Sequence, residues 1–75
     1  MGKKRLDAFC PVLRRFRHEK KLTQDKLSEM VGVESPYISM LESGHNYPNL
    51  AMIFKLADAL EVPASTIIFE VEKER

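Results

Sequence analysis

Few side chains of this chain are of the types that perform covalent or metal chemistry. Its one cysteine, Cys10, and its two histidines, His18 and His45, are too scattered for a zinc site, whose ligands come in closely spaced pairs. No glycine-rich loop is present to hold a phosphate group, and 75 residues leave little room for a catalytic pocket around a serine, a histidine and an acid. The sequence therefore predicts no enzymatic activity, no metal site, no cofactor and no small-molecule ligand.

Residues 23–43 have the pattern of two short helices joined by a tight turn. The hydroxyl of Thr23 can accept a hydrogen bond from an unpaired amide of the first turn, which makes this residue a good N-cap. Gly32 stands where a left-handed residue ends the first helix, and Gly44 does the same for the second. Within these two segments apolar side chains recur at helical spacing: Leu27, Met30, Val31, Ile38 and Leu41. Such a pair can insert one helix into a DNA major groove, and the same pattern fits an ordinary helical hairpin.

The order of residues here resembles the Cro/CI-type helix-turn-helix family, also called the XRE or lambda-repressor-like family. The resemblance is carried by Leu22-Thr23-Gln24, Leu27, Gly32-Val33, Tyr37-Ile38-Ser39, Leu41-Glu42 and Gly44, and then by Pro48, Leu50, Leu56-Ala57, Leu60 and Val62. It covers about residues 12–69 and implies an all-α, five-helix DNA-binding domain of a transcriptional regulator. We expect one domain over residues 1–75, with a basic N-terminal arm (1–6), the helix-turn-helix (23–43) and a charged tail (70–75).

The resemblance also implies which side chains meet DNA. Gln24, at the start of the first helix of the pair, matches a family glutamine that meets a phosphate. The positions that face bases in the family correspond to Ser35, Pro36, Ser39 and Met40. Further candidates for backbone contact are Thr23, Tyr37, Ser43, His45 and Asn46.

This set departs from the usual family pattern. No Lys or Arg occurs between Lys26 and Lys55, so bidentate recognition of a guanine from this helix is excluded. Serine hydroxyls can hydrogen-bond to almost any base edge, Met40 and Pro36 can pack against thymine methyl groups, and Glu34 can accept from a cytosine amino group. Since one good bidentate pair is worth ~1–3 kcal/mol of discrimination, we expect modest base specificity, with DNA shape and dimer spacing contributing more.

Charge is unevenly distributed along the chain. Residues 1–26 hold nine of the twelve Lys and Arg against three acids, whereas residues 27–75 hold three bases against eight acids. This polarity suits a protein whose N-terminal part meets phosphate, although basic N-terminal segments are also often only solvated. For Arg17 the resemblance implies a different role, a structural ion pair with Glu42.

The C-terminal part is unusually apolar for so small a domain. We expect a short fifth helix over residues 64–68, after which the tail either extends as a strand or frays. The following residues are expected to form a dimer interface, because a monomer of this size does not need so much apolar surface: Ile67, Ile68, Phe69 and Val71.

Together these features predict a regulator that binds an inverted repeat in double-stranded DNA as a homodimer. The lone cysteine, the lack of a signal peptide and the lack of an apolar run near roughly 18 residues indicate a reducing cytoplasm and no membrane. The alternative is a protein-interaction module, such as an accessory or antitoxin-like partner, that keeps the fold without specific DNA binding. Methionine at an exposed contact surface would suit that alternative as well.

Overall fold

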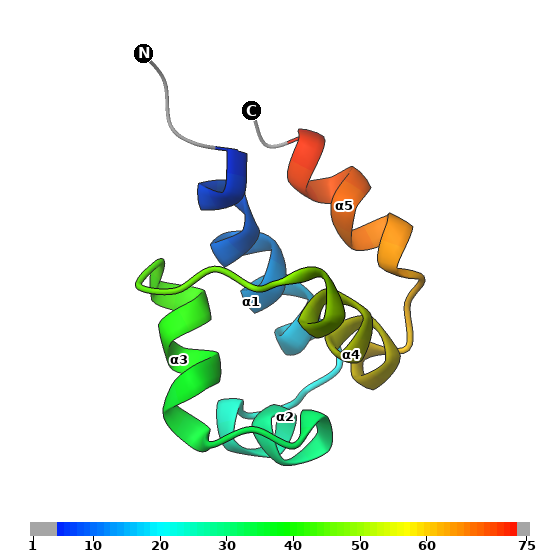
Figure 1. Cartoon of the computed structure of the whole chain (residues 1–75). Helices are drawn as coiled ribbons and strands as arrows, with labels where there is room; N and C mark the ends of the chain where they lie inside the picture. The colour runs from blue at the N-terminus through cyan, green and yellow to red at the C-terminus, as the bar shows by residue number, and fades with distance from the viewer. Residues whose placement is uncertain (1–4, 74–75) are drawn as a thin grey trace.

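The computed structural model describes residues 5–73, which form five α-helices and contain no β-strand (Figure 1). After a short 3-10 helix, η1 (Arg5–Ala8), the helices are α1 (Phe9–Glu19), α2 (Gln24–Val31), α3 (Ser35–Ser43), α4 (Leu50–Leu60) and α5 (Ala64–Lys73). The expected all-α, five-helix fold is therefore confirmed. Most of the predicted basic arm and the last two residues of the tail lie outside the described residues. None of the described helices is long and apolar enough to cross a membrane.

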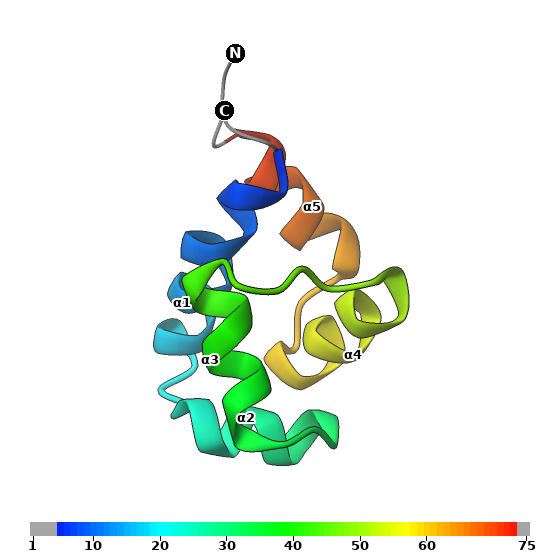
Figure 2. The same ribbon diagram turned by 60° about the vertical axis from the view of Figure 1, so that its left-hand side comes forward.

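The helices enclose one hydrophobic core, to which every α-helix contributes. α1 packs against α3 and α5, while α2 packs against α3 and α4. Viewed from the side, α3 lies on the outside of this arrangement with its whole length accessible along one face (Figure 2). The largest fully buried side chains are Phe9, Leu13, Leu27, Ile38, Leu41, Leu56, Leu60 and Ile67. The core thus holds α3 by its inner face and leaves the outer face free.

Local capping signals set the ends of the central helices. The Thr23 hydroxyl accepts from the amide of Lys26 at 3.0 Å, and the Asn49 side chain accepts from the amide of Met52 at 2.8 Å. Gly32 ends α2 in the left-handed conformation, with φ of 79°. Thr23 and Gly32 are positions at which the sequence predicted helix boundaries, because such signals act within one turn of the chain.

The exposure of two apolar residues and the length of the fifth helix differ from what the sequence pattern predicts. Met30 and Leu50 fall on the helical stripes of α2 and α4, yet their exposed fractions are 47% and 68%. The fifth helix was expected over 64–68 and extends instead to Lys73. It continues because Ile67 and Val71, one turn apart, both pack on the core.

The turn between α1 and α2 contains a residue in the left-handed region, Lys21, with φ of 58°. This conformation costs a residue with a Cβ atom roughly 1–2 kcal/mol, and glycine adopts it freely. We expect Lys21→Gly to raise the free energy of unfolding by about 0.5–1 kcal/mol, after the higher entropy of unfolded glycine is subtracted. Thermal unfolding followed by circular dichroism measures the change.

Gly32→Ala is the matched control for that measurement. An added Cβ at Gly32 would meet no atom within 4 Å, so only backbone strain opposes the substitution. We expect a loss of about 1 kcal/mol. If Lys21→Gly lowers the stability as Gly32→Ala does, the turn does not adopt the left-handed conformation.

Candidate DNA-binding surface

The outer face of α3 presents small, neutral side chains. Ile38 and Leu41 are fully buried on the inner face, which fixes the rotation of the helix about its own axis. Met40 remains 38% exposed. The candidate contact residues of α3 that lie exposed on its outer side are Ser35, Pro36, Ser39, Met40 and Ser43.

Two of the exposed serines already have side-chain partners. Ser35 donates its hydroxyl to a carboxylate oxygen of Asp25, which links the first turn of α3 to the first turn of α2. The hydroxyl of Ser43 lies 2.7 Å from Nδ1 of His45, just beyond the helix. Within the part of the chain that the structure describes, Ser39 has no side-chain partner, so its hydroxyl can donate as well as accept.

The remaining candidates for DNA contact differ in how far their side chains are exposed. Thr23 and His45 are exposed, whereas Asn46 is half-buried and accepts from the amide of Tyr47 through its side-chain oxygen at 3.0 Å. Tyr37, a candidate for backbone contact, is half-buried and packs partly against the core. Its ring therefore offers less contact surface than the sequence indicated.

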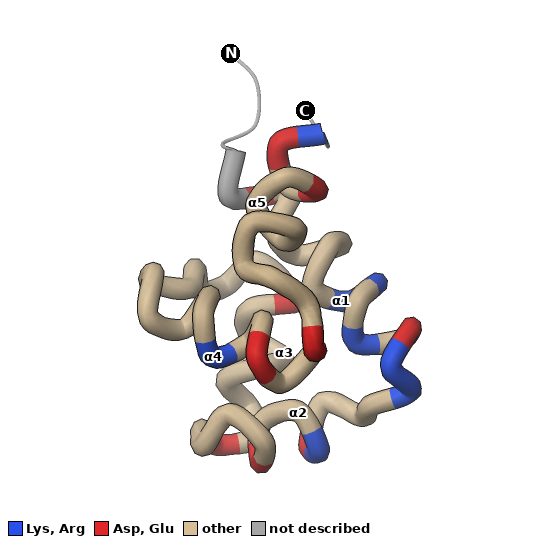
Figure 3. Tube along the Cα trace, turned by 90° about the vertical axis from the view of Figure 1, so that its right-hand side faces the viewer, with Lys and Arg blue, Asp and Glu red and all other residues tan. Residues whose placement is uncertain are grey.

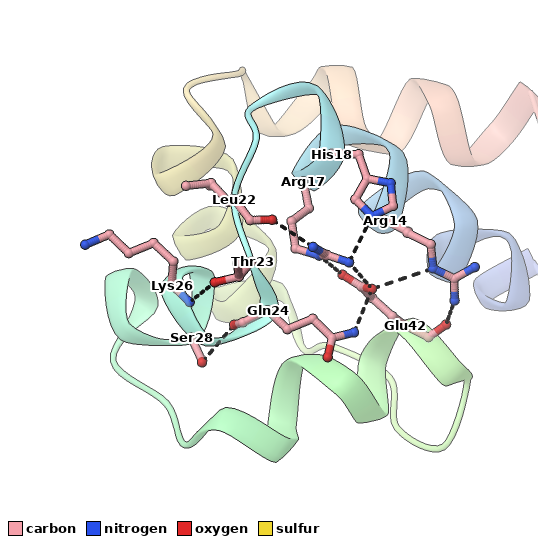
Figure 4. A network of polar contacts seen from close by, with 9 residues as sticks. All are labelled: Arg14, Arg17, His18, Leu22, Thr23, Gln24, Lys26, Ser28 and Glu42. Atoms are coloured by element: carbon pink, nitrogen blue, oxygen red, sulfur yellow. Dashed lines mark hydrogen bonds and ion pairs between the residues drawn. The ribbon is translucent and has the colours of Figure 1, made fainter.

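A buried ion pair joins α1 to the end of α3 (Figure 4). Arg17 donates from Nε to Oε2 of Glu42 at 2.6 Å and from Nη2 to Oε1 at 3.0 Å. Its Nη1 donates to the carbonyl oxygen of Leu22 at 2.7 Å. Arg17 is only 8% exposed and Glu42 only 3%. The geometry is the bidentate pairing of a guanidinium with a carboxylate, and Nη2 also lies 3.2 Å from Nε2 of His18.

Gln24 belongs to the same set of contacts. Its Nε2 donates to Oε1 of Glu42 at 3.0 Å, so one of its two amide hydrogens points into the protein (Figure 4). The backbone amide of Lys26 already donates to Thr23, so the other side-chain amide hydrogen of Gln24 and the backbone amides of Gln24 and Asp25 are the donors that could meet an anion. The contacts of Glu42 therefore also determine how the Gln24 side chain is held.

The pKa of Glu42 follows from these surroundings. Burial alone would raise the pKa of this carboxyl group, because it disfavours the charged form. Hydrogen bonds from Arg17 and Gln24, with the positive charges of Arg17 and Arg14, outweigh burial and hold the pKa below its ordinary value. Glu42 is thus an ionised group inside the domain.

Lys and Arg residues lie along α1 and the turn that follows it (Figure 3), and most of their side chains pair with acids within the molecule. The pairs are Arg14 and Arg17 with Glu42, Arg15 with Glu70, Lys20 with Glu61, and Lys26 with Glu29. All four acids come from residues 27–75. Folding thus reduces the charge separation seen along the sequence, and the expected basic front is smaller than the count of residues indicated. The exposed pairs contribute little stability, so a phosphate can replace the acid at low cost.

One of these contacts was not predicted from the sequence. The sequence assigned no partner to Arg14, and in the structure its Nη2 donates to the backbone carbonyl oxygen of Glu42 at 2.8 Å. The available signal was spacing, because residues three apart on a helix share a face and Arg17 was already assigned to Glu42. Arg14 and Arg17 both contact the last turn of α3.

The predicted dimer residues separate into two groups. Ile67 is only 1% exposed, so it belongs to the core of one chain, and its assignment to an interface was wrong. Val71 is half-buried against the core. Ile68 and Phe69 are 43% and 58% exposed and remain available on α5. Ile67 and Val71, one helical turn apart, face the core, and Ile68 and Phe69 face outward.

Known protein families fit this arrangement. The helix-turn-helix family matches residues 13–67, a span that runs from α1 to α5. The chain belongs to this family, of the Cro/CI type.

Two curated relatives support the same assignment. The chain is similar to the HTH-type transcriptional repressor RghR of Bacillus subtilis, with 36% identity over 66 residues, which are 87% of this chain and 49% of the relative. It is also similar to the uncharacterized HTH-type transcriptional regulator y4dJ of Sinorhizobium fredii, with 40% identity over 48 residues, or 64% of this chain and 62% of the relative. The chain therefore spans less than two thirds of the length of either relative.

Two solved structures have the same fold. The clp gene regulator ClgR from C. glutamicum superimposes with a TM-score of 0.89 at 25% identity, over 97% of this chain and 95% of that one. The restriction-modification controller protein C.AhdI from Aeromonas hydrophila gives 0.79 at 32% identity, over 83% and 94%. This Cro/CI-type chain thus shares the helix-turn-helix fold of transcriptional regulators over nearly its whole length.

Proposed function

We propose that this Cro/CI-type chain is a transcriptional regulator of the cytoplasm that binds an inverted repeat in double-stranded DNA as a homodimer. The observation that carries the proposal is the outer face of α3, which is exposed along the helix while its inner face is fixed in the core. Ser39 and Met40 stand at the centre of that face as base contacts. Gln24 and the start of α2 supply a phosphate contact beside it.

The homodimer rests on α5. Ile68 and Phe69 expose large apolar side chains on the outer side of this helix. Two copies joined there would present two α3 helices to successive major grooves on one side of the duplex. Because base contacts from α3 are few and neutral, the second half-site supplies much of the affinity.

A protein-interaction module is the second candidate, and one surface feature favours it. A shallow groove runs between the α2–α3 turn and α3, and most of the side chains that line it are apolar. Its lining residues are Gly32, Val33, Glu34, Pro36, Tyr37 and Met40. A partner helix or loop seated there would use the flexible Met40 and would exclude DNA from the same face.

Selection from a randomised duplex pool at low salt tests the proposed function. We expect enrichment of a palindrome whose half-site centres lie about 34–36 Å apart, one turn of the duplex. Repeating the measurement at several salt concentrations adds a second criterion, since affinity for DNA falls with a slope near −0.9 for each phosphate neutralised. Recovery of an unenriched pool with a flat salt response would favour the protein-interaction module.

Single substitutions separate backbone contacts from base contacts. We expect Gln24→Ala to weaken binding to all duplexes alike, because a phosphate contact carries no sequence information. Ser39→Ala and Met40→Ala should instead alter preference at one or two base pairs, by about 1 kcal/mol each. Competition binding against duplexes with single base-pair changes measures both effects. A uniform loss in all three variants would contradict this division.

A further inference from the structure

Two contacts attach Arg14 of α1 to the last turn of α3. Its Nη2 donates to the carbonyl oxygen of Glu42 at 2.8 Å, and its Nε lies 3.6 Å from Oε1 of the Glu42 side chain. The guanidinium therefore contacts both the backbone and the carboxylate of one residue (Figure 4). Backbone movement of Glu42 away from α1 would break the first contact even if the side chain kept its partners.

The carbonyl that Arg14 contacts is one that the helix itself cannot satisfy. The last four carbonyl groups of an α-helix lack intrahelical partners. In α3, the Met40 carbonyl accepts from the amides of Gly44 and His45, and the Glu42 carbonyl accepts from Arg14. A cation at this position also interacts favourably with the negative end of the helix dipole. Arg14 thus acts as a C-cap supplied by another helix.

Arg14 and Arg17 differ in what they contribute. The Arg17 side chain is 10% exposed and carries the buried ion pair, whereas the Arg14 side chain is 49% exposed. The Arg14 end of its ion pair with Glu42 is solvated, although the Glu42 side chain is 2% exposed, and Nε lies 3.6 Å from Oε1, so we expect the pair to add less to global stability than the Arg17 pair does. The effect of the Arg14 contacts is local and falls on the turn that contains Met40 and Ser43. Contacts to base edges require placement within about 0.5 Å, so a looser last turn costs binding more than it costs folding.

We propose that Arg14 is a positioning residue for DNA recognition, which fixes the last turn of α3 from α1 and is not itself a phosphate ligand. The inference rests on the proposed function, because the effect is expressed through DNA contacts of α3. The competing role is a direct phosphate contact by the exposed guanidinium.

Arg14→Met and Arg14→Lys distinguish the two roles on the duplex selected above. If Arg14 positions α3, Arg14→Met weakens binding about tenfold, the value of one charge-assisted hydrogen bond, with the salt slope unchanged. Preference at the base pairs facing Met40 becomes broader. Arg14→Lys does not restore that preference, because an ammonium cannot contact carbonyl and carboxylate as the guanidinium fork does. If Arg14 binds phosphate, Arg14→Met lowers the slope by about 0.9, Arg14→Lys restores binding, and the proposal is overturned.

Arg15→Met is the matched control on the same helix. Arg15 pairs with Glu70 of α5 at 2.7 Å. This variant should leave base preference unchanged. If Arg15→Met broadens base preference as Arg14→Met does, the cause is the loss of a positive charge on α1 and not the loss of the contact with Glu42.

A measurement on the free protein, without DNA, tests the positioning role independently of the proposed function. In the free protein, Arg14→Met should shift the amide resonances of Glu42, Ser43 and Gly44, and speed their hydrogen exchange, while α2 and α5 stay unchanged. Unaltered resonances at the end of α3 would overturn the positioning role. If these resonances shift but the duplex pool shows no enrichment, the contact stands and the proposed DNA binding fails.

Discussion

Replacing Arg17 by alanine is expected to lower the free energy of unfolding by about 3–5 kcal/mol, the cost of leaving one charge of a buried pair without its partner. The Glu42 carboxylate would keep only Gln24 and the more distant Arg14 guanidinium as donors. A domain of this size has a small margin of stability, so much of the folded population should be lost near physiological temperature. Urea unfolding followed by circular dichroism measures the change.

The double variant Arg17→Met with Glu42→Leu is the control for that measurement. Replacing both partners of a buried pair with apolar side chains of similar volume is often neutral or stabilising. We therefore expect the double variant to recover most of the stability lost in Arg17→Ala. An unchanged stability in Arg17→Ala would show that the pair has no structural role.

The same pair predicts how stability depends on pH. Glu42 has a pKa lowered in the folded domain, because the contacts of Arg17 and Gln24 outweigh the opposing effect of burial. Its contribution is therefore fully present above the pKa of the unfolded carboxyl group, about 4.3, and is lost as the pH falls through the lower folded value. The double variant should lack this part of the acid dependence, and an identical acid dependence in both proteins would contradict the assignment.

Local features of this fold were predictable from sequence, and contacts between distant residues were less so. Thr23 and Gly32 act on amides and carbonyls within one turn, so their roles follow from residue type. The pairing of Arg17 with Glu42 required a resemblance, because 25 positions separate them and many other acids were available. The Arg14 contact had only the helical spacing to indicate it. Composition could not show how many bases of residues 1–26 pair with acids of residues 27–75, because the fold determines which side chains meet.

The burial of apolar residues was also only partly predictable from the sequence. Helical spacing predicts which residues share a face, but it does not say whether that face meets the core or the solvent. Leu50 lies on the stripe of α4, as the first residue of that helix, and is 68% exposed. Ile67 and Phe69 are equally apolar and two positions apart, and only the packing of α5 shows that the first belongs to the core.

Replacing Phe69 by glutamate is expected to separate the two chains of the proposed dimer. Phe69 is 58% exposed, so the substitution leaves the core intact and should not change thermal stability of the monomer. A charge buried at an apolar interface without a partner opposes association strongly. Affinity for a duplex with two half-sites should fall by about 10²–10⁴, the gain that joining two binding modules provides, while affinity for one half-site stays constant. Sedimentation equilibrium and titration with both duplexes measure the two effects.

Phe54→Glu provides a matched control, since Phe54 is 55% exposed on α4 and has the same chemistry. If α5 forms the interface, this variant remains dimeric and keeps its affinity for both duplexes. Dissociation by Phe54→Glu but not by Phe69→Glu would move the interface from α5 to α4. That outcome would keep the homodimer and change the separation of the two α3 helices, so the selected half-site spacing would have to agree with the new geometry. The spacing of the inverted repeat and the site of the interface are thus two measurements of one structural quantity.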